Sequence, residues 1–113
     1  MIKENFLENW EAQIKKGLLD YLVLNSLKTK SLYGHQILAI LKEEFQLDVA
    51  EGTLYPKLKK MKSDGLLLSE WRGQENDLGT PKKYYYLTGQ GKVLIKEMEA
   101  YLSSTIQPIF LAA

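Results

Sequence analysis

The feature that most constrains the fold is a change of hydrophobic period at Gly65. Before this glycine, apolar residues recur every three or four positions in three stretches: about 1–29, 33–45 and 51–64. After it, residues 66–72 and 82–87 alternate like β-strands, and a helical period returns over 88–111. Because a period near 3.6 indicates a helix and a period of two a strand, the chain is predicted to run helix, helix, helix, strand, strand, helix.

This order of elements predicts a mainly α-helical fold with a small β-hairpin. Three helices followed by a two-stranded hairpin is the layout of a winged helix-turn-helix, with the third helix as recognition helix and the hairpin as wing. We expect a winged-helix DNA-binding domain over 1–87, including the N-terminal helix, and a C-terminal dimerisation helix over 88–113. Thr88 suits the N-cap of that last helix, and Pro108 is predicted to kink or end it.

The composition excludes several classes of function. The chain has no cysteine, so it has no disulfide, thiolate metal site or cysteine nucleophile. Its single histidine, His35, belongs to no Ser-His-Asp or metal-ligand cluster, and we interpret it as a surface or capping residue. We therefore expect no enzyme activity, no cofactor and no metal. No apolar run is long enough to span a membrane and the N-terminus does not resemble a signal peptide, which favours a cytoplasmic location.

The third predicted helix carries the clearest functional signal. Residues 53–63 contain four lysines and no acid, although the net charge of the chain is only +1. When the apolar residues face the core, the opposite side of the helical wheel presents small and basic residues: Gly52, Thr53, Lys59, Lys60 and Ser63. Such a face suits the DNA major groove, because lysines neutralise phosphates and small residues permit close approach. The alternative is a lysine-rich face that only keeps the helix soluble.

Two other segments favour the same interpretation. Arg72, Lys82 and Lys83 flank the predicted wing loop, whose tip carries two acidic residues that phosphates would repel, so we expect DNA contacts from Lys82 and Lys83. Tyr33 and Gly34 open the second helix, where a glycine allows a phosphate to approach the helix N–H groups. The alternative for this pair is a turn glycine beside a packing tyrosine.

Both ends of the chain carry more apolar surface than a small core needs. In the first helix these residues are Phe6, Leu7, Trp10 and Ile14. In the last helix they are Met98, Tyr101, Leu102, Ile106 and Ile109. Because large exposed apolar patches mark interfaces, we predict a twofold homodimer built on these two helices. Such a dimer would set the two recognition helices about 34 Å apart, one turn of DNA.

Three motifs, taken together, resemble the PadR-like transcriptional regulators. The most specific is EGTLYP at 51–56, with GL following at 65–66. The second is GTPKKYY at 79–85 followed by LT at 87–88, and the third is LYG at 32–34. The resemblance covers about residues 17–91.

The resemblance implies a winged-helix domain, a C-terminal dimerisation helix and repression of promoters through a palindromic site. The single last helix looks like the short subgroup of the family. By position, the resemblance assigns residues that face DNA or organise that surface: Tyr33, Gly34, Thr53, Tyr55, Lys82 and Lys83. The chain departs from the family at His35, where tyrosine is common, and at Tyr86, where arginine is common, so one wing cation is lost.

Some short members of the family look like drug sensors with an aromatic dimer cavity. This implies Trp10, Tyr101 and Phe110 as speculative ligand residues for a small aromatic effector, although the same residues could simply pack the dimer. We therefore expect a sequence-specific, homodimeric repressor that binds double-stranded DNA and is relieved by a small molecule or a stress signal. The alternatives are a multidrug or aromatic-ligand sensor with the dimer cavity as its primary site, and a winged helix that contacts only proteins.

Overall fold

The computed structural model describes residues 2–73 and 79–112. The helices are α1 (Ile2–Ser26), α2 (Gly34–Phe45), α3 (Glu51–Ser63), α4 (Gly89–Tyr101), the π-helical turn η1 (Leu102–Ile106) and α5 (Gln107–Leu111). The strands are β1 (Leu32–Tyr33), β2 (Leu67–Arg72) and β3 (Lys82–Leu87). The mainly α-helical fold class and the predicted order of elements are confirmed. Glu75 and Asp77, the acidic residues of the predicted wing tip, lie outside the described residues.

The core lies between the second half of α1, helices α2 and α3, and one face of the sheet. In α3 the residues at positions i, i+4 and i+7, Leu54, Leu58 and Met61, are buried as their spacing predicts. They pack in one cluster with Val23 of α1 and Ile37 of α2, both fully buried. This packing fixes which side of α3 remains free: the side that carries small and basic residues.

The sheet has three antiparallel strands in the order β1-β3-β2. The hairpin register pairs Leu67 with Leu87 at its base and Trp71 with Lys83 nearer its tip. The short strand β1 pairs with the other edge of β3 and joins the start of α2 to the wing. The sequence did not predict β1, because two residues are too few to display a period.

Two caps determine where α3 ends and α4 begins. Gly65 has φ +80°, a left-handed conformation that ends α3 and favours glycine. The Thr88 hydroxyl accepts a hydrogen bond from the backbone N–H of Gly91 at 3.0 Å, which confirms the predicted N-cap. The same hydroxyl donates to the Gly65 carbonyl at 2.6 Å. One side chain therefore joins the end of α3 to the start of α4.

Pro108 does not end the last helix, which continues to Leu111. The disturbance lies in the preceding turn, where the backbone N–H of Gln107 donates to the Leu102 carbonyl five residues earlier. Proline has no N–H and its ring crowds the preceding turn, and the wider π-type turn makes room for the ring.

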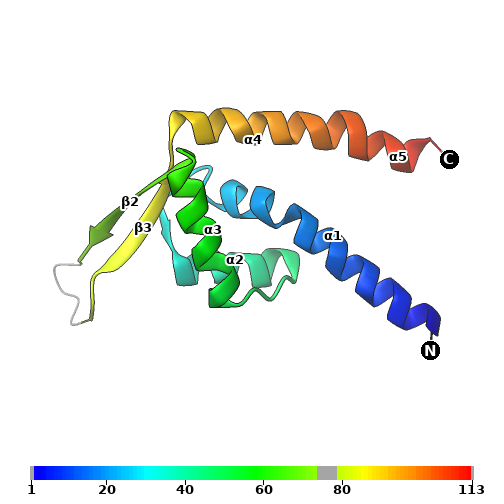
Figure 1. Cartoon of the computed structure of the whole chain (residues 1–113), viewed down its shortest axis with the longest axis horizontal. Helices are drawn as coiled ribbons and strands as arrows, with labels where there is room; N and C mark the ends of the chain where they lie inside the picture. Colours follow the sequence, from blue (N-terminus) through cyan, green and yellow to red (C-terminus); the bar gives the residue numbers. More distant parts are fainter. Residues whose placement is uncertain (1, 74–78, 113) are drawn as a thin grey trace.

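The molecule is elongated because two helical arms leave the core. Figure 1 shows α1 and α4–α5 diverging, with both termini on one side and the wing on the other. The Cα radius of gyration is 16.5 Å, against roughly 13 Å for a compact domain of this length. At the α1–α4 junction, the Glu99 carboxylate accepts hydrogen bonds from Lys28 at 2.8 Å and from Tyr21 at 3.2 Å. Within the described residues, no helix is both long and apolar enough to cross a membrane.

Candidate nucleic-acid interface

A recess of about 560 Å³ lies where the wing meets the starts of α2 and α3. Three segments that are distant in the sequence line it: Tyr33, Gly34 and His35; Tyr55; and Trp71, Pro81, Lys82, Lys83 and Tyr85. Five of the residues predicted to face DNA are therefore in one place. The lining is mainly aromatic, with two lysines on the wing side.

Gly34 and Tyr55 determine the shape of this recess. A side chain at position 34 would clash with the Tyr55 ring, so glycine is needed for the ring to lie across the start of α2. Burial raises the pKa of the Tyr55 phenol, and the nearby Glu51 carboxylate raises it further. Like an ordinary tyrosine, Tyr55 is protonated at neutral pH and can donate a hydrogen bond to a phosphate oxygen.

The wing cations lie over aromatic rings. The Lys82 ammonium is 5.3 Å from the centre of the Tyr33 ring, and the Lys83 ammonium is 5.9 Å from the Trp71 and Tyr85 rings. Within the described residues, neither lysine has a carboxylate at ion-pair distance. Arg72 differs, because it donates to the Glu70 carboxylate at 2.7 Å and stacks on Tyr84. Lys82 and Lys83 thus keep a net charge available to an anionic partner.

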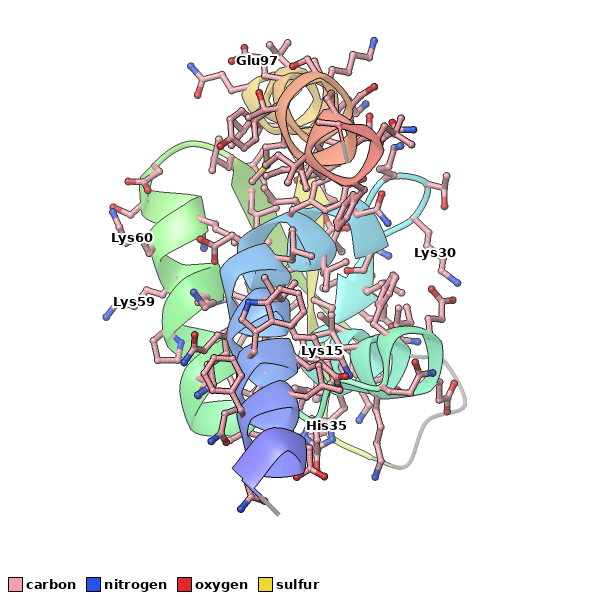
Figure 2. The ribbon with its side chains drawn as sticks, turned by 90° about the vertical axis from the view of Figure 1, so that its right-hand side faces the viewer. Lys15, Lys30, His35, Lys59, Lys60 and Glu97 are labelled. Carbon is pink, nitrogen blue, oxygen red and sulfur yellow. The ribbon has the colours of Figure 1, made fainter. Side chains whose placement is uncertain are left out.

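The four lysines of α3 are not equivalent. Lys57 forms an ion pair with Asp20 of α1 at 2.8 Å, and Lys60 one with Asp64 at 3.1 Å. Lys62 donates to the Ser69 hydroxyl at 2.7 Å. Among the described side chains, Lys59 has neither a carboxylate nor a hydrogen-bond acceptor within reach. Figure 2 shows Lys59 and Lys60 projecting outward from α3.

The exposed side of α3 carries the rest of the predicted DNA surface. Gly52, Thr53 and Ser63 are exposed along with Lys59 and Lys60. Nothing lies within 4 Å of the position that a side chain at Gly52 would occupy. This side is therefore an open surface that continues from the recess along the helix.

Comparison with known proteins identifies the family. The sequence profile described as the transcriptional regulator PadR-like family matches residues 23–97, more than half of the chain. The chain belongs to the PadR-like family of transcriptional regulators. Because this is a family of regulators, membership also confirms the expectation that the chain is not an enzyme. A comparison with curated proteins finds no match.

Solved structures of PadR-like proteins agree with this assignment. A PadR-like transcription factor from Bacteroides fragilis is 38% identical, with a TM-score of 0.74 over 93% of this chain and 99% of that one. A PadR-family regulator from Eggerthella lenta is 27% identical, with a TM-score of 0.84 over 99% and 96% of the two chains. PadR of Bacillus subtilis, solved with operator DNA, is 30% identical, with a TM-score of 0.63 over 72% of this chain and 46% of that one.

The predicted dimer residues of this PadR-like chain lie on the arms, away from the recess. The strongly exposed ones are Phe6, Leu7, Trp10, Ile14, Tyr101 and Ile109, while Met98, Leu102 and Ile106 are half-buried. Phe110, a speculative ligand residue, is 71% exposed on α5. A cavity of about 360 Å³ between α1 and α4 includes Tyr101 in its lining, but neither Trp10 nor Phe110. One protomer therefore does not gather the three aromatic residues into that cavity.

Sequence reasoning missed two residues of the PadR-like recess. The His35 ring nitrogen is 2.9 Å from the Glu51 carboxylate, so this exposed pair links the starts of α2 and α3. Trp71 faces the recess but carried no functional signal, because strand alternation assigns it to the same face as buried Leu67. The sequence does not reveal that the core ends before the strand reaches Trp71.

Proposed function

We propose that this PadR-like chain is a homodimeric repressor of transcription that binds double-stranded DNA through α3 and the adjoining recess. The observation that carries the proposal is the convergence of five residues from three separate segments: Tyr33, Gly34, Tyr55, Lys82 and Lys83. A protein that only packed its own core would have no need for two wing lysines that, within the described residues, have no carboxylate at ion-pair distance.

The geometry suits a division of labour on DNA. The open side of α3, with Gly52, Thr53, Lys59 and Ser63, fits the major groove, where side chains reach base edges. The recess fits the sugar–phosphate backbone beside that groove, because Lys82 and Lys83 supply charge and Tyr55 a hydrogen-bond donor. Backbone contacts then fix the register of α3, and the contacts of α3 supply sequence specificity.

The dimer follows from the arms. The exposed apolar stripe on α1 and the exposed aromatic residues of α4–α5 lie on divergent helices that one protomer leaves uncovered. A second copy that covers both would bury them and pair two recognition helices on a palindromic operator. The operator complex of Bacillus subtilis PadR supports an operator as the target. Acting on chromosomal DNA would place the protein in the cytoplasm.

A second role, sensing of a small aromatic compound, is favoured by the cavity between α1 and α4. Its walls are largely apolar and come from both arms, and Tyr101 is at its edge. A planar ligand there would change the angle between the arms and so release the operator, which is the relief of repression that we propose. A purely protein-binding winged helix is disfavoured because it gives no anionic partner to Lys59, Lys82 and Lys83, which have no carboxylate at ion-pair distance within the described residues.

The test is the affinity of the purified protein for its own promoter region, measured by fluorescence anisotropy at two salt concentrations with nonspecific competitor. We expect competitor-resistant binding that weakens steeply with salt, since each neutralised phosphate contributes about −0.9 to the slope of log K against log salt. Lys82→Ala with Lys83→Ala should flatten that slope by nearly two units in total if each lysine holds one phosphate. An affinity that changes neither with salt concentration nor with these substitutions would contradict the proposed DNA-binding surface.

A further inference from the structure

We infer that Trp71 of the wing is a DNA-contacting residue that packs its indole against the deoxyribose–phosphate backbone. The inference rests on the proposed DNA-binding function and adds to it an apolar contact outside the basic residues. Trp71 supplies affinity in this scheme and does not select the base sequence.

The position of Trp71 on the sheet carries the first step. Its cross-strand neighbour is Lys83, and it shares a sheet face with Leu67, which is buried at the base of the hairpin. Toward the tip this face runs past the core and opens into the recess that Tyr55 and Lys83 also line. Trp71 is 69% exposed there. The core-facing side of the wing thus ends in an uncovered indole beside the recognition helix.

The surroundings of Trp71 indicate an anionic partner. The Lys83 ammonium is 5.9 Å from the indole ring, and Lys82 lines the same recess, while the exposed apolar residues of the arms lie at the other end of the molecule. An indole flanked by cations suits a surface that alternates apolar sugar and charged phosphate, because the ring covers the sugar while the lysines reach the phosphates. The recess is aromatic as well as basic, and an apolar protein surface would give the charges of Lys82 and Lys83 no anionic partner, whereas DNA phosphates would.

The first experiment compares Trp71→Ala with Leu68→Ala in the full-length protein on promoter DNA. Leu68 is a matched control, because it is an exposed apolar residue of the same strand (48% exposed) on the opposite face. We expect Trp71→Ala to weaken binding about tenfold on specific and nonspecific DNA alike, and Leu68→Ala to leave it within twofold. Circular dichroism should show both variants folded, since neither side chain is in the core.

The salt dependence separates the indole from its neighbouring lysine. Trp71→Ala removes no charge, so its plot of log K against log salt should run parallel to that of the wild type. Lys83→Ala should instead flatten the slope by about 0.9. A Trp71→Ala variant with a flatter slope would mean that the ring only positions Lys83, and would overturn a direct contact.

A spectroscopic measurement on the wild-type chain makes the contact visible. The protein has only two tryptophans, Trp10 and Trp71, so 5-fluorotryptophan labelling gives two fluorine resonances, which Trp71→Phe assigns. Saturating DNA should shift the Trp71 resonance and leave that of Trp10 in place. If the wild type binds DNA but the Trp71 resonance does not move and Trp71→Ala binds normally, the inference is wrong and the proposed function stands. If the wild type binds no DNA, the proposed function fails, and the inference with it.

Discussion

The wing side of the molecule and its helical arms expose aromatic residues for opposite reasons. In the recess, Tyr55 and Trp71 lie among lysines, and long-range packing of three segments puts them there. In the arms, Phe6 and Phe110 are exposed at 72% and 71%. Residues 102–111 contain no charged side chain at all. The recess is therefore formed entirely by one protomer and presents charge. The arms instead present apolar surface that one protomer leaves exposed.

The largest expected effect tests whether a second copy of the chain covers the exposed apolar surface of the arms. Leu102→Glu places a charge in the predicted interface between the arms and should raise the dimer dissociation constant by about 30-fold or more, the size of a hot-spot substitution. Val93→Glu is the control, because Val93 is an exposed residue of α4 outside the predicted interface. Sedimentation velocity over a concentration series gives both constants. Equal constants for the two variants would move the interface away from Leu102.

The next effect tests whether the recess is complete in one protomer. Gly34→Ala would force the Tyr55 ring out of its position, so we expect it to lower the free energy of unfolding by about 1–3 kcal/mol and to weaken DNA binding. Gly52→Ala makes the same change where nothing lies within 4 Å, so it should leave stability unchanged or slightly increased. Urea denaturation of both variants measures the difference. A Gly34→Ala protein as stable as the wild type would show that the Tyr55 side chain can adopt another conformation at no cost in stability.

A smaller effect separates the lysines of α3. Lys59 has no carboxylate at ion-pair distance within the described chain, while Asp64 holds Lys60 toward the end of the helix at 3.1 Å. We expect Lys59→Ala to flatten the salt slope of DNA binding by about 0.9, and Lys60→Ala by less. Anisotropy titrations at several salt concentrations give the slopes. The reverse order would mean that DNA approaches α3 nearer its C-terminal end than proposed.

The smallest effect concerns the junction from which the arms diverge. The hydrogen bond from Lys28 holds the pKa of Glu99 below its ordinary value. A carboxyl group whose folded-state pKa is lowered stabilises the fold above its unfolded pKa, and that stabilisation is lost as pH falls through the folded pKa. Glu99→Gln should therefore lower the melting temperature modestly at pH 7, and the difference from wild type should shrink by pH 3.

Glu97→Gln is the matched control for this pH dependence. Glu97 lies two residues earlier on α4, is exposed, and is labelled at the top of the molecule in Figure 2. Within the described residues, no cation is at ion-pair distance from it. Its melting-temperature difference from wild type should not follow the pattern of Glu99→Gln between pH 7 and pH 3. A Glu99→Gln difference that stayed constant with pH would mean that the junction does not depend on the charge of Glu99.

Sequence periodicity predicted the helices and the hairpin, but it did not predict the features that depend on where the core ends. Buried Leu54 and Leu58 follow from helical spacing, and the hairpin follows from alternation. Strand β1 depends on pairing with β3 from far along the chain, and Trp71 is exposed because the core ends below it; neither is a local property. The pairing of Lys60 with Asp64 is different, because a spacing of four on one helix is visible in the sequence and could have separated Lys60 from Lys59.

The Thr88 hydroxyl, which joins Gly65 to the start of α4, gives the molecule a pivot. The end of the recognition helix and the start of the arm are joined there, so a turn of the arm would be passed to the recognition helix. In a dimer whose arms pack against each other, a change in the angle between the arms would rotate both recognition helices about the Thr88 junction of each protomer. The spacing of the two helices along DNA would then be the quantity that the proposed effector adjusts, while the recess of each protomer kept its shape.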